Sequence, residues 1–242
     1  METAWNSEAV IFDCDGVLVD SEVLALEVEL EALAELGVIY DPAEFRRRFN
    51  GMPDSAFLPA LSADVLVRRG EPLPDTFPQL HADRYGLAVR ERLVEVDGAL
   101  GAVGQCRVKK AVASSSKSAL LRFKLEKVGL WDAFAQHVYS GDLVANGKPA
   151  PDLFLYAARA LHVDPCRCVV IEDSINGVRA GRAAGMTVWG FVGGGHCSAT
   201  SGPELTEAGA DRIMRDWSEC GEALAQLGPK PEPLLGERVC SR

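Results

Sequence analysis

Two aspartates, Asp13 and Asp15, stand one residue apart in the stretch AVIFDCDGVLVDSE, which begins at Ala9. Four apolar residues lead into the pair and a glycine follows it. Like charges this close repel each other, so packing gives no reason to end a buried strand in this way. Paired carboxylates suit chemistry instead, because they can hold a metal ion, attack an electrophile or transfer protons.

Three further polar clusters also follow short runs with the character of buried strands. They are Ser114, Ser115 and Ser116 after KAVA, Lys148 a short loop after HVYS, and Glu172 with Asp173 after CVVI. In an open parallel sheet, ligands bind beyond the carboxyl ends of the strands. The sequence therefore predicts that all four clusters converge on one edge of a sheet.

Each cluster taken singly has a simpler interpretation. An Asp-x-Asp-Gly stretch after a strand can be a tight turn, and serines or acidic residues before a helix can cap it. A lysine before a proline, as in Lys148-Pro149, can be a solvated loop residue. Four such clusters at one edge of one sheet are hard to explain by turns and caps, so we favour a functional site.

Several carboxylates in one crevice need a counter-ion, and hard oxygen ligands select Mg²⁺. We expect Mg²⁺ as the cofactor, held by Asp13, by the backbone carbonyl of Asp15 and by Asp173, with Glu172 as support or alternative ligand.

These residues together suit phosphoryl transfer. The carboxylate of Asp13 is the predicted nucleophile, which would form an aspartyl-phosphate. Asp15 would protonate the leaving oxygen and then take a proton from the attacking water. Ser114 and Ser115 would hold phosphate oxygens, and Lys148 would neutralise charge between the phosphate and Asp13.

Strand-like and helix-like runs alternate from Lys109 onward, which predicts right-handed βαβ crossovers and a parallel sheet covered on both faces. The fold class is therefore α/β with a Rossmann-like core. No convincing strand lies between Ser21 and Leu93, so we expect an inserted, all-helical cap domain. The predicted division is residues 1–20 and 94–227 for the core, 21–93 for the cap and 228–242 for a loosely ordered tail.

The composition limits the partners. The chain has 242 residues, 48% of them hydrophobic, with 25 basic and 35 acidic side chains, which gives a net charge of −10. Such an acidic chain is a poor general binder of nucleic acid or anionic membranes. We expect a cytoplasmic protein that is a monomer, keeps its seven scattered cysteines reduced and acts on a small phosphorylated metabolite.

The stretches FDCDGVLVDSE, ASSSKS, GKPAPD and VVIEDSINGVRAGRAAGM resemble the four signature motifs of the haloacid dehalogenase-like (HAD) hydrolases, in the same order. The most similar branch contains β-phosphoglucomutase and small sugar-phosphate phosphatases, and the resemblance spans residues 9–215. It implies a Rossmann-like core, a helical cap inserted after the first strand, Mg²⁺ and an aspartyl-phosphate. It also implies the same roles as above for Asp13, Asp15, Ser114, Lys148 and Asp173.

Departures from related enzymes favour hydrolysis. Haloacid dehalogenases resemble this chain but need no metal and lack an equivalent of Asp15. Enzymes similar to β-phosphoglucomutase carry a histidine where this chain has Ala25, and an arginine near the place of Asp54. An acidic residue there would repel a second phosphate. We therefore expect a phosphomonoesterase acting on a sugar or sugar-alcohol phosphate, with a sugar phosphomutase as the alternative.

The cap is expected to select the substrate, because it closes over the crevice. The predicted crevice-facing residues are Glu22, Asn50, Gly51 and Met52, with Arg46 to Arg48, unless those arginines only solvate a helix face. The loop GGGHC, which contains His196, is expected to be a turn with a smaller chance of substrate contact.

Two other classes of protein compete with an enzyme. A signalling receiver domain also gathers carboxylates, a hydroxyl and a lysine around Mg²⁺, but it has neither a helical insertion after its first strand nor an acid/base two residues beyond the first aspartate. A binding protein built on an inactive enzyme core would show a substituted catalytic position, and none is substituted here.

Overall fold

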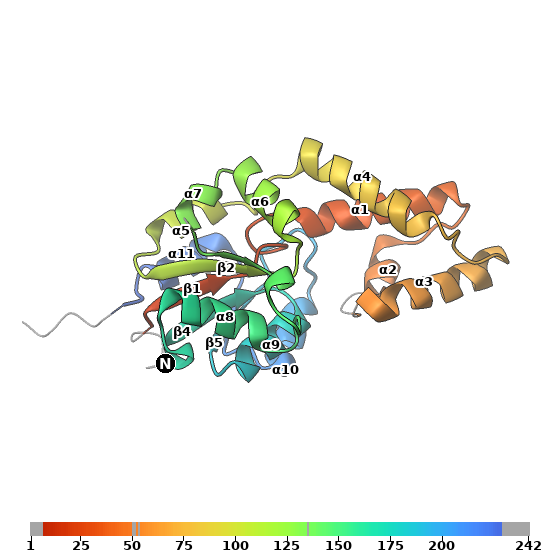
Figure 1. Ribbon diagram of the computed structural model, residues 1–242. Helices are drawn as coiled ribbons and strands as arrows, with labels where there is room; N and C mark the ends of the chain where they lie inside the picture. The colour runs from red at the N-terminus through yellow and green to blue at the C-terminus, as the bar shows by residue number, and fades with distance from the viewer. Residues whose placement is uncertain (1–6, 50–51, 53, 135, 229–242) are drawn as a thin grey trace, which may run out of the picture.

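The computed structural model describes residues 7–49, 52, 54–134 and 136–228. One sheet of six parallel strands forms its centre, in the order β3-β2-β1-β4-β5-β6 (Figure 1). The strands are β1 Ala9–Phe12, β2 Lys109–Ser114, β3 Val138–Ser140, β4 Cys168–Glu172, β5 Thr187–Phe191 and β6 Arg212–Met214. Each run that the sequence predicted as a strand is part of this sheet.

Helices cover both faces of the sheet. They are α5 Ala99–Gln105, α6 Ser118–Lys127, α7 Trp131–Phe134, α8 Asp152–Leu161, α9 Ile175–Ala183, α10 Ser201–Ala208 and α11 Trp217–Leu224, with short 3₁₀ turns at Gly141–Leu143 and Pro165–Arg167. Parallel strands buried on both faces read as continuous apolar runs, which is why β1 and β4 show no polar alternation.

The alternation of side chains along β1 divides the core into two layers. Val10 and Phe12 point to the layer formed with α5, α6, α7 and α11, where the ring of Phe12 lies 5.5 Å from Phe134 and 6.1 Å from Trp217. Ala9 and Ile11 point to the opposite layer, formed with α8, α9 and α10. Both faces of the central strand are thus sealed, and only its carboxyl end remains available for chemistry.

Four helices between the first two strands form a separate unit, to one side of the sheet in Figure 1. They are α1 Ser21–Glu35, α2 Pro42–Phe49, α3 Asp54–Arg69 and α4 Phe77–Arg92. Asp41 accepts hydrogen bonds from the backbone of Ala43 and Glu44 and so caps α2, whose first residue is Pro42. The helices bury their own aromatic cluster, which includes Tyr40, Phe45 and Phe49.

The two chain segments that lead into and out of the helical unit run side by side. Val19 forms a bridge with Glu95, and the backbone N–H of Asp20 donates to the carbonyl of Val94 at 3.1 Å. The α/β fold with an inserted helical cap is therefore confirmed. Residues 229–242, which belong to the predicted tail, lie outside the described residues.

The described part of the chain contains six cysteines, and all are free thiols. Among the same residues, no helix combines the length and the apolar character needed to cross a lipid bilayer.

Candidate active site

The carboxyl ends of the central strands meet at one edge of the sheet. Phe12 pairs with Val112 on one side and with Ile171 on the other, so the residues that follow in each strand lie level. Asp13 comes directly after β1, while Ser114 and Glu172 end β2 and β4. The convergence predicted from the sequence is therefore present in the fold.

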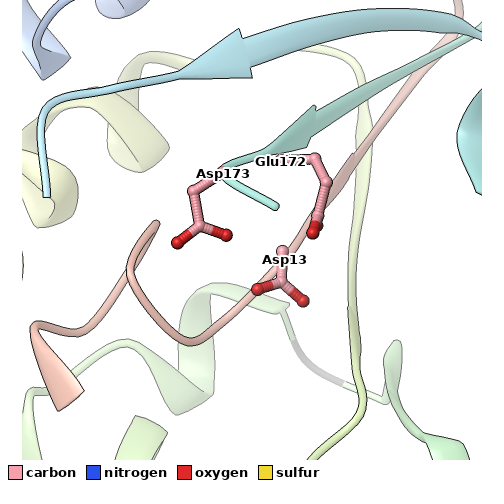
Figure 2. Close-up of side chains that lie close together, drawn as sticks. All are labelled: Asp13, Glu172 and Asp173. Atoms are coloured by element: carbon pink, nitrogen blue, oxygen red, sulfur yellow. The ribbon is translucent and has the colours of Figure 1, made fainter. Parts of the chain in front are cut away.

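Three carboxylates face one another at this edge, those of Asp13, Glu172 and Asp173 (Figure 2). One carboxylate oxygen from each lies within 4.8 Å of the others. Asp13 and Glu172 are buried, the latter only 1% exposed. Burial, and then the neighbouring charge of Glu172, raise the pKa of Asp13, while Lys148 opposes this shift.

Lys148 supplies the positive charge inside this cluster. Its Nζ donates to Oδ1 of Asp13 at 2.6 Å and to Oε2 of Glu172 at 3.1 Å. Burial alone would lower the pKa of Lys148, but the attraction of these two carboxylates outweighs it and raises the pKa. The alternative of a solvated loop lysine is excluded, because the side chain is buried between two acids.

Gly16, the glycine after the aspartate pair, is required by the close approach of Asp173. Its φ is +73°, and a Cβ atom there would lie 1.9 Å from Oδ2 of Asp173. A larger residue at this position would therefore displace a carboxylate of the cluster. The glycine of Asp-x-Asp-Gly serves the site as well as the turn.

The donor set fits a divalent cation. The three carboxylates of the cluster outnumber the cations that contact them, Lys148 and the protonated His196, so net negative charge remains in a buried space. Oxygen donors of this kind suit Mg²⁺, and Asp13, Glu172 and Asp173 are the side chains that would hold it. The carboxylate of Asp15 points elsewhere.

Asp15 is held by donors from three elements. Ser21 at the start of α1 and Lys124 of α6 donate to its Oδ1, while Ser116 and Ser114 donate to its Oδ2 at 2.7 and 3.2 Å. Burial raises the pKa of Asp15, but the charge of Lys124 and these hydrogen bonds lower it below the usual value. Asp15 is therefore ionised in this arrangement.

Lys124 is a site residue that the sequence analysis missed. It is 1% exposed and lies with Leu121 and Leu125 on the buried face of α6. Its Nζ contacts both Asp15 and, at 3.1 Å, the hydroxyl of Ser116. A signal was present, because the spacing of residues 121, 124 and 125 places a lysine within an apolar helical stripe.

The serine run does not cap the following helix. The residue at the N-cap position of α6 is Lys117, whose side chain does not bond the helix, and the backbone N–H of Ser118 donates instead to Oδ2 of Asp142 at 2.9 Å. The hydroxyl of Ser114 instead accepts from the backbone N–H of Ser116 at 3.0 Å and donates to Asp15. Ser115 is exposed beside them.

His196 lies against the carboxylate cluster, from the loop that follows β5. Its Nε2 is 3.0 Å from Oδ2 of Asp173, and its Nδ1 is buried with no partner. Although burial alone would lower the pKa of His196, the hydrogen bond to Asp173 raises it to about 11. The loop is therefore part of the site, which the sequence had indicated only weakly.

A cavity of about 180 Å³ lies between the cap helices and the loop that carries His196. It is lined by Glu22, Ala25, Leu26, Glu29, Phe45, Arg46, Phe49, Met52, Phe57 and His196. Three of the predicted crevice residues, Glu22, Arg46 and Met52, are in this lining, whereas Asn50 and Gly51 lie outside the described residues.

Arg47 and Arg48 are not in this lining, which matches the alternative that these arginines only solvate a helix face. Arg48 pairs with Asp64 of α3, and Arg47 is exposed.

Comparison with known proteins identifies the class to which this fold and site belong. The family model of the haloacid dehalogenase-like hydrolases matches residues 8–185. The chain belongs to this family, as an enzyme of its phosphatase type.

Two relatives cover most of the chain. The phosphorylated carbohydrates phosphatase of Thermotoga maritima is 34% identical over 212 residues, which are 86% of this chain and 94% of that protein. Hexitol phosphatase B of Escherichia coli (strain K12) is 34% identical over 197 residues, which are 77% of this chain and 84% of that protein.

Two further matches differ in extent. A solved haloacid dehalogenase-like protein from Agrobacterium tumefaciens is 36% identical, with a TM-score of 0.83 over 90% of this chain and 98% of that chain. The chloroplastic protein SUPPRESSOR OF QUENCHING 1 of Arabidopsis thaliana is 36% identical over 183 residues, but these make up only 17% of that protein.

Proposed function

We propose that the protein is a Mg²⁺-dependent phosphomonoesterase that hydrolyses a small sugar or sugar-alcohol phosphate through an aspartyl-phosphate on Asp13. The observation that carries the proposal is the double contact of Lys148 with Asp13 and Glu172 beside Asp173. A buried nucleophile, a fixed cation and a divalent-metal donor set lie together at one strand end. Such positioning and charge neutralisation are what phosphoryl transfer requires.

Asp13 attacks the phosphorus atom and the leaving oxygen departs with a proton from Asp15. Water then attacks the aspartyl-phosphate, and Asp15 takes the proton. Lys124 holds Asp15 ionised, so Asp15 is ready to take the proton from the attacking water. For the attack of Asp13 on the phosphorus atom, Asp15 must first gain the proton that it gives to the leaving oxygen. Ser114, Ser115 and Lys148 would bind phosphate oxygens, and bound Mg²⁺ would neutralise charge on the phosphate and on Asp13.

The cap selects the leaving group in this proposal. Residues 21–93 form the cap, and residues 1–20 with 94–227 form the catalytic core. The cavity between them is lined by charged and aromatic side chains, which suits a small hydroxylated molecule. The two relatives that act on phosphorylated carbohydrates and hexitol phosphates support this substrate class.

Hydrolysis is favoured over a phosphomutase reaction. Ala25 lines the cavity and offers no group for proton transfer at the position where mutases carry a histidine. Two acidic residues, Glu22 and Glu29, line the same cavity and would repel a second phosphate. We also propose that the enzyme acts as a cytoplasmic monomer, and the free thiols of the described residues support the reducing compartment.

The test is the release of inorganic phosphate from p-nitrophenyl phosphate and from a panel of sugar phosphates, with Mg²⁺ and with chelator. Asp13→Asn should lower turnover at least about 10³-fold, because the amide is not a nucleophile, while the circular dichroism spectrum stays unchanged. Asp83→Asn is the control, since Asp83 is exposed on α4, where its Oδ1 accepts a hydrogen bond from Gln79 at 2.9 Å.

Near-normal turnover of Asp13→Asn would refute the nucleophile. A bisphosphate-dependent interconversion of sugar monophosphates with little free phosphate would instead identify a mutase.

A further inference from the structure

Among the described residues, four buried side-chain atoms have no hydrogen-bond partner: Oε1 of Glu29, Nε of Arg46, Nε2 of His81 and Nδ1 of His196. Glu29, Arg46 and His196 line the cap cavity. Nε2 of His81 lies 3.9 Å from Oε2 of Glu29. Three of the four side chains with unsatisfied atoms therefore line the cap cavity, and the fourth, His81, lies beside Glu29.

Glu29 is the costliest member of this group. It is 7% exposed and lies on the buried face of α1, next to Val28 and one turn before Ala32 and Leu33. A buried carboxyl oxygen without a donor destabilises a fold, and an apolar side chain there would pack without this cost. A group of this kind is typical of a site that a ligand completes.

The cavity runs along α1, away from the phosphate site. At its inner end His196 contacts Asp173, and Glu22 follows Ser21, which bonds Asp15. Glu29, two turns further along α1, lines the part of the cavity away from that end, and Arg46 of α2 lines the same cavity. Glu22 and Glu29 are seven residues apart, which is about 10 Å along a helix axis.

We propose that Glu29 and Arg46 form a distal subsite that binds the far hydroxyl groups of a neutral, open-chain polyol monophosphate of about six carbons. The proposal rests on the proposed phosphomonoesterase function and deepens it. Its basis is that one unpaired acceptor, Oε1 of Glu29, and one unpaired donor, Nε of Arg46, belong to side chains that line the same small cavity.

Neutral hydroxyl groups fit this pair better than other ligands. A hydroxyl donates to the Glu29 carboxylate while a neighbouring hydroxyl accepts from Nε of Arg46, so both atoms gain partners. A terminal carboxylate or second phosphate would meet Arg46 favourably but would also face Glu29 and Glu22. The volume of about 180 Å³ corresponds to about six water-sized groups, which suits a polyol chain and excludes a nucleotide.

The test compares substrates of two lengths. Kinetics are measured with sorbitol 6-phosphate, whose chain reaches the outer end, and glycerol 3-phosphate, whose chain does not. Glu29→Gln should lower kcat/KM for sorbitol 6-phosphate about tenfold relative to glycerol 3-phosphate, because a charged acceptor is lost at the far end only. Arg46→Gln should shift the same ratio in the same direction.

Matched controls lie on the same helices. Glu27 is exposed on the other face of α1 and pairs with Arg92, and Arg47 is exposed on α2. Glu27→Gln and Arg47→Gln should leave the ratio of the two kcat/KM values unchanged.

A second measurement separates a ligand-binding role from a structural one. Glu29→Gln should raise the melting temperature of the substrate-free protein at pH 8 by at least about 4 °C, because it removes a buried, unpaired carboxylate. A group that holds the cap together would give a lower melting temperature instead.

Three outcomes overturn the inference. The first is an unchanged substrate ratio in Glu29→Gln, and the second is an equal loss for both substrates. The third is a preference for a sugar bisphosphate or an aldonate phosphate over sorbitol 6-phosphate. If the wild-type protein released phosphate from no monoester at all, the proposed function itself would fail and the inference with it.

Discussion

Lys124 places a full positive charge in the interior of the core, beside Asp15 and beneath the ring of Tyr85. Tyr85 belongs to α4 of the cap, and its ring centroid lies 5.3 Å from Nζ. Burial by itself lowers the pKa of Lys124, but the attraction of Asp15 outweighs it and raises the pKa. One side chain thus contacts the proposed acid/base and the cap together.

Replacement of this lysine should affect stability and chemistry together. Lys124→Met is expected to lower the free energy of unfolding by about 2 kcal/mol, because Asp15 loses its charge partner but keeps three hydroxyl donors and some solvent. It should also lower kcat for alkyl phosphates about tenfold, since Asp15 is less well positioned. Urea unfolding and steady-state kinetics measure the two effects.

The control is Lys127→Met, one turn further along α6, where the lysine is exposed and donates only to a cap carbonyl at 2.7 Å. If both variants were equally stable and equally active, the proposed positioning of Asp15 by Lys124 would be wrong.

At the scale of elements, α1 has two functions on one helix. Its first residue, Ser21, bonds Asp15, and the stripe from Glu22 to Glu29 lines the cap cavity. The following residues, Ala32 and Leu33, are part of the aromatic cluster that holds the cap together. A helix that spans both units therefore links the chemistry at the core to the leaving-group cavity.

Glu29, on the buried face of α1, should make the free energy of unfolding depend on pH. Burial raises the pKa of Glu29 to about 7, against roughly 4.3 in an unfolded chain. The folded state thus favours the protonated carboxyl, so this stability is fully present below the unfolded pKa and is lost as the pH rises through 7. Burial lowers the pKa of His81, whose Nε2 lies 3.9 Å from Oε2 of Glu29, so this imidazole is neutral at pH 7 and above.

Glu29→Gln lacks this titration. Relative to wild type, its free energy of unfolding should therefore rise by about 2 kcal/mol between pH 5 and pH 8. Urea unfolding at both pH values measures the difference, with Glu27→Gln as the control. If the difference in free energy of unfolding between Glu29→Gln and wild type were the same at both pH values, the pKa of Glu29 in the folded protein would equal its value in the unfolded chain.

At the scale of the whole molecule, the sheet brings together carboxylates that are far apart in the chain. Asp13 follows β1, whereas Glu172 ends β4 and Asp173 follows it, and the pairing of β1 with β4 brings one oxygen of each carboxylate within 4.8 Å of the others. The resulting concentration of negative charge opposes folding unless a cation compensates it. Metal binding and stability should therefore be coupled.

Mg²⁺ at about 100 times its dissociation constant should raise the melting temperature by about 5 °C, because the ion binds the folded carboxylates only. Asp173→Asn should remove most of this shift, while Asp83→Asn, on the exposed face of α4, should keep it. Differential scanning fluorimetry with Mg²⁺ and with chelator gives the measurement. A shift of the same size in Asp173→Asn would place the ion elsewhere.

The sequence by itself determined the elements and the order of the chemical groups. Apolar runs that end in polar residues specify the strands, and their alternation with helices specifies a parallel sheet, whose carboxyl ends must share one edge. The positions of Asp13, Ser114, Lys148 and Asp173 follow from these local rules. The all-helical insertion followed equally from periodicity.

Only the tertiary structure decided the partners of the charged groups. Lys124 and Asp15 are 109 residues apart, and helical periodicity places a lysine on a buried face without indicating which acid it meets there. The same holds for His196 with Asp173, and for Glu29 and Arg46, which line one cavity. Side chains contact each other over only a few ångströms, whereas these partners are far apart in the sequence. Which of them meet therefore depends on how whole helices and loops pack.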